Sequence, residues 1–214
     1  MVAAVSVYLT RQAGPTAPKS PSAVPAAAQS NAQQAAQPNA GQQVGAAIAA
    51  CRTNWGEQSS ALDAADRSLA QWQTHVQAMN ALVAGKITYP QAVRFWARTR
   101  IGAMHRVRVF HRAYRSLRQS HPVCATPSGA PVTGRDAATL SACVRGVRAR
   151  DETLASAKTA IKTWRGHITE MEMLRNGQMS PSTATRMWIR SWHRGQRQLD
   201  DYRSLASRAS AQHC

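Results

Sequence analysis

The feature of this chain that most limits its fold is an internal repeat with an offset of 92 residues. Shifting the sequence by that amount aligns identical residues in one register, and no gap is needed before the final cysteine. The aligned pairs include Ala50/Ala142, Cys51/Cys143, Leu62/Leu154, Ala65/Ala157, Trp72/Trp164, His75/His167, Met79/Met171, Leu82/Leu174, Gly85/Gly177, Ala92/Ala184, Arg94/Arg186, Trp96/Trp188 and Arg98/Arg190. We interpret residues 44–214 as one domain that contains two copies of a structural unit, at about 44–126 and about 136–214.

Each copy has the pattern of two helices joined by a short connection. Apolar residues recur at spacings of three and four, which is typical of the buried face of an amphipathic helix. In the first copy they are Leu62, Ala65, Leu69, Trp72, Val76, Met79 and Val83. Gly85 and Gly177 are expected to end these helices, and Thr88 and Ser180, each with a nearby proline, are expected to cap the next ones. We expect one continuous return helix with an apolar face over residues 93–117 in the first copy. The fold class predicted is all-α: two duplicated antiparallel hairpins that form a four-helix bundle.

The four cysteines occupy matching places in the two copies. Cys51 lies 37 residues before Thr88 and Cys124 lies 36 after it, while Cys143 and Cys214 lie 37 before and 34 after Ser180. These positions meet at the open end of an antiparallel hairpin, so the spacing favours Cys51–Cys124 and Cys143–Cys214 among the three possible pairings. Disulfides would indicate an oxidising compartment. The alternative is four free, buried thiols in a reduced protein.

The N-terminal 43 residues have a different composition. A short apolar segment, residues 2–9, precedes a tract rich in Ala, Pro and Gln, which is typical of a disordered linker. The apolar segment is too short to span a membrane and lacks the basic start of a signal peptide. We therefore expect an extracytoplasmic protein, secreted or anchored by a membrane segment encoded upstream of Met1. An ordinary disordered tail is the alternative.

The charge of the chain is strongly positive. Lys and Arg number 27 against 10 Asp and Glu, which gives a net charge of +17. Such a protein attracts anionic partners, here a cell-envelope polymer, lipid headgroups or an acidic protein, with nucleic acid as an alternative. The candidate anion-binding residues are Arg94, Arg98, Arg108, Arg112, Arg186 and Arg190. The opposing interpretation is an ordinary solvated helix surface.

Two repeated His/Met pairs are candidate metal ligands. His75 and Met79 lie four residues apart on one side of a helix, and His167 and Met171 repeat the pair. Imidazole and thioether donors that converge between the hairpins would suit copper. The alternative is that both pairs are core residues, since methionine commonly fills gaps in a core. The tryptophans are expected in the core, or around a cavity for a small ligand.

No catalytic constellation is present, and we expect no enzymatic activity. The sequence contains no Walker loop, HExxH, GxSxG or CxxC motif. The leading interpretation is a non-enzymatic module that engages an anionic surface or partner through arginine-rich helix faces. The alternatives are a carrier for copper or a small ligand and an intracellular nucleic-acid binder.

Overall fold

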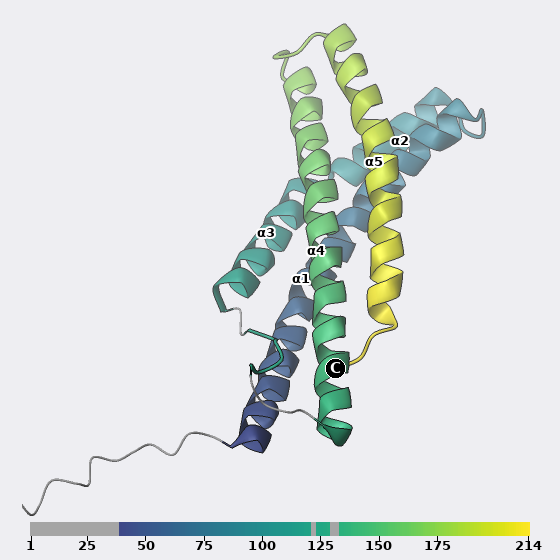
Figure 1. Ribbon diagram of the computed structural model, residues 1–214. Coiled ribbons are helices and arrows are strands. Elements are labelled where there is room, and N and C mark those ends of the chain that lie inside the picture. Colours follow the sequence, from purple (N-terminus) through teal and green to yellow (C-terminus); the bar gives the residue numbers. More distant parts are fainter. Residues whose placement is uncertain (1–38, 121–122, 129–132) are drawn as a thin grey trace, which may run out of the picture. The chain divides into compact units, whose positions relative to one another are not determined.

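The structure, a computed structural model, describes residues 39–120, 123–128 and 133–214, and this part of the chain contains helices and no strand (Figure 1). The helices are α1 (Ala40–Val83), α2 (Tyr89–Arg100), α3 (Ala103–Ser120), α4 (Gly134–Arg175) and α5 (Pro181–Ser210). The predicted all-α class is confirmed. The apolar segment and most of the predicted linker lie outside the described residues. α1 begins at Ala40, four residues before the predicted start of the first repeat.

The helix ends follow the local signals in the sequence. Thr88 accepts a hydrogen bond from the Gln91 N–H, and the Gln91 side chain accepts one from the Thr88 N–H at 2.7 Å, so the predicted capping box is present. Ser180 caps α5 in the same position of the second hairpin. Gly85 and Gly177 have φ values of 67° and 70°, a left-handed conformation that favours glycine after a helix.

Residues 89–120 do not form the continuous helix that we expected. They divide into α2 and α3 at Ile101–Gly102, where Gly102 has a φ of 69°. The Gln71 amide donates a hydrogen bond to the Ile101 carbonyl at 2.8 Å and so satisfies a backbone acceptor that the break frees. In the second copy the aligned residue is Arg194, within the uninterrupted α5. The left-handed glycine therefore marks the break.

The main core lies between α1 and α4, and α3 and α5 pack against this pair. Trp72 of α1 and Trp164 of α4 are 1% and 0% exposed, and their stacked rings lie 4.7 Å apart. The prediction that these two tryptophans are buried is confirmed. Val83 and Val93 were expected on buried faces but are 65% and 42% exposed. Both lie beside the connection between α1 and α2, where the helices extend past their neighbours.

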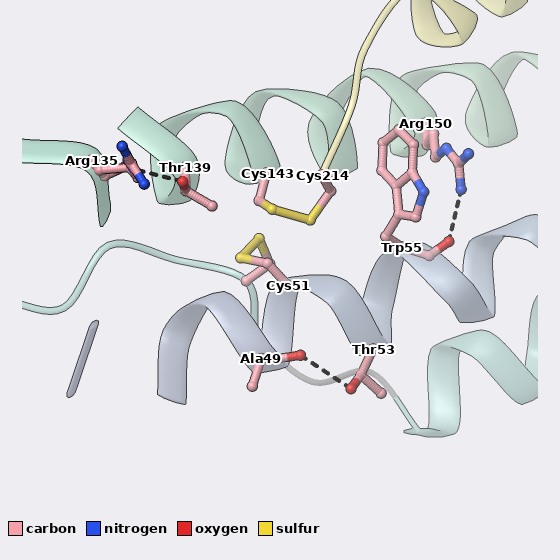
Figure 2. Close-up of a disulfide and its surroundings, with 10 residues drawn as sticks. Ala49, Cys51, Thr53, Trp55, Arg135, Thr139, Cys143, Arg150 and Cys214 are labelled. Atoms are coloured by element: carbon pink, nitrogen blue, oxygen red, sulfur yellow. Dashed lines mark hydrogen bonds between the residues drawn. A yellow bond between two sulfur atoms is a disulfide. The ribbon is translucent and has the colours of Figure 1, made fainter. Parts of the chain in front are cut away.

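Both predicted disulfides, Cys51–Cys124 and Cys143–Cys214, are present in the structure. Cys51 and Cys143 are fully buried, and the two disulfides belong to one small apolar cluster separate from the main core. Figure 2 shows the Cys143–Cys214 bond next to Cys51. The disulfides indicate an oxidising, extracytoplasmic environment. Within the part of the chain that is described, no helix is long and apolar enough to cross a membrane.

Candidate functional site

The candidate site is a cavity of about 120 Å³ between helices. Residues of α1, α2, α4 and α5 form its walls. They are Trp72, His75, Val76, Met79, Trp96, His167, Met171, Trp188 and Trp192. The cavity thus brings together all four predicted metal ligands, which the sequence places in two pairs 92 residues apart. The remaining lining is almost entirely aromatic.

The two histidines are in direct contact with each other at the wall of this cavity. Their Nε2 atoms lie 3.0 Å apart, and the side chains of His75 and His167 are 6% and 5% exposed. The Nδ1 atom of His75 lies 2.8 Å from the Thr99 hydroxyl oxygen. That hydroxyl donates its proton to the Phe95 carbonyl at 2.9 Å, so it accepts from the Nδ1–H of His75. The Nε2 atom of a neutral His75 is then left with its lone pair directed at His167.

The other histidine has a less complete set of partners. Its Nδ1 lies 3.8 Å from a carboxylate oxygen of Glu170 and makes no hydrogen bond within the described residues. In a neutral pair, the Nε2–H of His167 donates to His75, and the bare Nδ1 then faces the carboxylate. A cation between the two Nε2 atoms would reverse this tautomer, because His167 could then carry its proton on Nδ1 and donate it to Glu170.

The environment keeps His75 neutral. The pKa of His75 is lowered from its ordinary value to about 2, mainly because the side chain is buried and further because His167 lies beside it. A neutral imidazole is the form that binds metals through its free nitrogen.

Three tryptophans complete the aromatic wall. Trp96 and Trp188, which are equivalent in the repeat, lie with ring centroids 6.0 Å from His75 and 5.8 Å from His167, respectively. Trp192 donates a hydrogen bond to the Asn80 side-chain oxygen at 2.7 Å, and this bond ties α5 to α1 beside the cavity. In the first copy the aligned residue is Arg100, so the two sides of the cavity differ here.

Sequence reasoning missed Thr99 and Glu170, which lie beside the Nδ1 atoms of the two imidazoles. Thr99 is aligned with Ser191, whose hydroxyl lies 3.4 Å from Glu170, so both copies place a hydroxyl group at the equivalent position. This repeated hydroxyl was a usable signal. Glu170 had no such signal, since the aligned residue in the first copy is Ala78.

The six predicted anion-binding arginines do not form one site. They are exposed, and none of them forms an ion pair within the described residues. Arg94 and Arg98 lie on α2, Arg108 and Arg112 on α3, and Arg186 and Arg190 on α5. Arg108 and Arg112 line a groove with other cationic residues.

The described residues contain no group of three or more His, Cys, Asp or Glu side chains that could hold a metal ion. The cavity therefore depends on thioether sulfur atoms for any ligands beyond the two imidazoles. In the comparisons with known proteins, no protein family, curated protein or solved structure matches this chain.

Proposed function

We propose that the protein is a non-enzymatic extracytoplasmic carrier of a soft metal ion, Cu(I), which binds in the cavity between the hairpins. One observation carries the proposal: the Nε2 atoms of His75 and His167 lie 3.0 Å apart in a cavity that Met79 and Met171 also line. Two imidazoles and two thioethers form a neutral, soft donor set, and soft sulfur ligands select Cu(I) among the common biological metals.

The spacing of the imidazoles suits a shared metal ion. Two nitrogen ligands at about 2.0–2.1 Å from a tetrahedral metal lie about 3.3 Å from each other. The observed separation of 3.0 Å would need to widen by only a few tenths of an ångström. Thr99 and Glu170 would then hold the Nδ1–H groups of the two histidines, as hydroxyls and carboxylates do behind metal-bound imidazoles.

The size of the cavity favours a metal ion over a larger ligand. Pockets for drug-sized ligands typically measure about 300–1,000 Å³, whereas this cavity measures about 120 Å³. The aromatic lining would keep water from the ion, and the faces of the tryptophan rings favour a cation electrostatically.

We also propose that the architecture arose by duplication, with the hairpins α1 to α3 and α4–α5 forming a four-helix bundle. Residues 92 positions apart meet in two places, because Trp72 stacks on Trp164 and His75 contacts His167. Anchoring to a membrane by a segment upstream of Met1 remains part of the proposal.

Anaerobic titration with Cu(I), with a colorimetric chelator as competitor, tests the metal site. We expect one ion per chain in the wild type and loss of that binding in His75→Gln. The double variant Met79→Leu/Met171→Leu conserves side-chain volume and should bind more weakly. Thr99→Val should lower the affinity about 10–100-fold, because it leaves the ligands in place but frees His75 to rotate.

The matched control is Met104→Leu. Met104 is a partly buried methionine of α3 that packs against the core but does not line the cavity. Its replacement should leave Cu(I) affinity unchanged. Absence of stoichiometric binding, or equal loss of affinity in Met104→Leu and in the double variant, would contradict the proposal. An organic molecule that copurifies in the cavity would instead favour a small-ligand carrier.

A further inference from the structure

A second candidate site lies on the surface between α3 and α4, away from the residues of the metal cavity. It is a groove of about 330 Å³ whose lining consists of cationic side chains and one histidine. They are Arg108, His111, Arg112, Arg115 and Arg165. The repeat did not predict this groove, because Arg165 aligns with Gln73 and no sequence pattern places Arg165 beside α3.

The two helices that form the groove carry no acidic residue near it. α3 contains five arginines and two histidines but neither Asp nor Glu. The segment of α4 from residue 153 to residue 169 contains Lys158, Lys162 and Arg165 and likewise no acid. The Lys158 ammonium lies 5.3 Å from the centre of the Tyr114 ring, so the cations of α4 do face α3. Nothing within these segments neutralises the positive charge.

His111 reports this local positive field. Burial lowers its pKa first, and the charges of Arg165, Arg115 and Lys158 lower it further. Its Nε2 atom is buried and makes no hydrogen bond within the described residues. The groove thus combines several guanidinium groups with an imidazole nitrogen that lacks a partner.

We propose that this groove binds a phosphate group, whether free or carried on a larger molecule. The guanidinium group suits phosphate because its planar fork can donate two hydrogen bonds to two oxygens of one group. Arginines from two different helices could approach the group from opposite sides, and His111 could donate a further hydrogen bond once protonated. The site is separate from the proposed metal site, so either can fail without the other.

The first probe is inorganic diphosphate, and its binding is measured by calorimetry at low and moderate salt. The test variant is Arg112→Glu/Arg165→Glu, which reverses one charge on each wall of the groove. The matched control is Arg186→Glu/Arg190→Glu, which changes the net charge equally on the exposed surface of α5. We expect the groove variant to lose about tenfold or more in affinity, because charged hydrogen bonds are lost. The control should lose far less.

A second readout is the titration of the His111 imidazole, measured by NMR. A bound phosphate group should raise the pKa of His111, because its negative charge offsets the nearby positive charges. These belong to Arg108, Arg112, Arg115, Arg165 and Lys158. The control is Arg186→Glu/Arg190→Glu, which should leave this phosphate-dependent shift of His111 in place. Far-ultraviolet circular dichroism checks that each variant is folded.

Further arms of the experiment distinguish the source of the phosphate. If the protein binds vesicles that contain phosphatidylglycerol and diphosphate displaces it from them, the natural phosphate group is carried on a lipid. Diphosphate binding without vesicle binding would identify a free one. Equal losses in the two double variants would show attraction by net charge alone and overturn the proposal. A single-stranded oligonucleotide that binds more tightly than diphosphate, and binds both variants equally, would also overturn the proposal. Nucleic acid would then use other arginines.

Discussion

Replacement of Gly195 by alanine should strain the centre of the fold. A Cβ atom built on Gly195 would lie 2.8 Å from Cε2 and 3.0 Å from Nε1 of Trp72, with an even closer contact to Cζ2. Trp72 has little room to move away, because it is 1% exposed and stacks on Trp164. The backbone of α5 or the tryptophan stack must therefore shift.

The size of the effect follows from two opposing contributions. Alanine is favoured over glycine inside a helix by about 0.5–1 kcal/mol. Overpacking of a tight core typically costs about 1–3 kcal/mol. Gly166 of α4 isolates the first contribution, because a Cβ there meets nothing within 4 Å. We expect Gly166→Ala to stabilise the protein slightly and Gly195→Ala to be less stable than Gly166→Ala by about 1–3 kcal/mol.

Urea unfolding of the two variants and the wild type, followed by tryptophan fluorescence, measures this difference. Because Trp72 also lines the cavity, Gly195→Ala should in addition weaken Cu(I) binding, whereas Gly166→Ala should not. If Gly195→Ala proves as stable as Gly166→Ala, the close packing of α5 on Trp72 is wrong.

Three further predictions concern stability. In metal-free protein, His75 should make stability fall as the pH drops below about 6.5, by up to about 1.4 kcal/mol per pH unit, because the unfolded chain takes up a proton that the folded state, with a pKa of about 2, does not. Urea midpoints of wild type and His75→Gln should therefore converge toward acid pH, and parallel curves would contradict this. Replacement of Cys143 and Cys214 by serine opens a link with a sequence separation of 71 and should cost about 4 kcal/mol in thermal or urea unfolding; an unchanged midpoint would count against a structural role. Thr88→Ala removes the cap of α2 and should cost about 1 kcal/mol, with Thr74→Ala, on the exposed surface of α1, as the control.

The features that the sequence predicted well depend on local chemistry. The ends of α1 and α4 follow from a glycine, and the starts of α2 and α5 from a side-chain cap with a nearby proline. The pairing of the cysteines could be predicted because hairpin geometry converts equal distances along the chain into proximity in space. The buried tryptophan stripe follows in the same way from helical periodicity.

The features that it predicted poorly depend on contacts between helices. Periodicity identifies the side of a helix that is buried, but it does not say how far the neighbouring helices extend, so Val83 and Val93 were assigned to the core. The break at Gly102 was visible as a glycine opposite Arg194, but a single glycine inside a helical pattern does not by itself require a break. The approach of Arg165 to α3 depends on how α3 packs against α4, which no local pattern encodes.

The proposed duplication gives a physical reason why the candidate metal ligands converge. Equivalent residues of two related units can touch only near the axis that relates them, so a residue placed there once in the unit appears twice in the site. Trp72 with Trp164 and His75 with His167 meet in this way. One His/Met pair per hairpin, too few to hold a metal alone, would then supply four donors. Two of the departures from the repeat lie beside the same cavity, since Trp192 aligns with Arg100 and Glu170 aligns with Ala78. His167 lies beside the Glu170 carboxylate and His75 beside the Thr99 hydroxyl, so we expect Glu170→Ala to weaken Cu(I) binding through His167 alone.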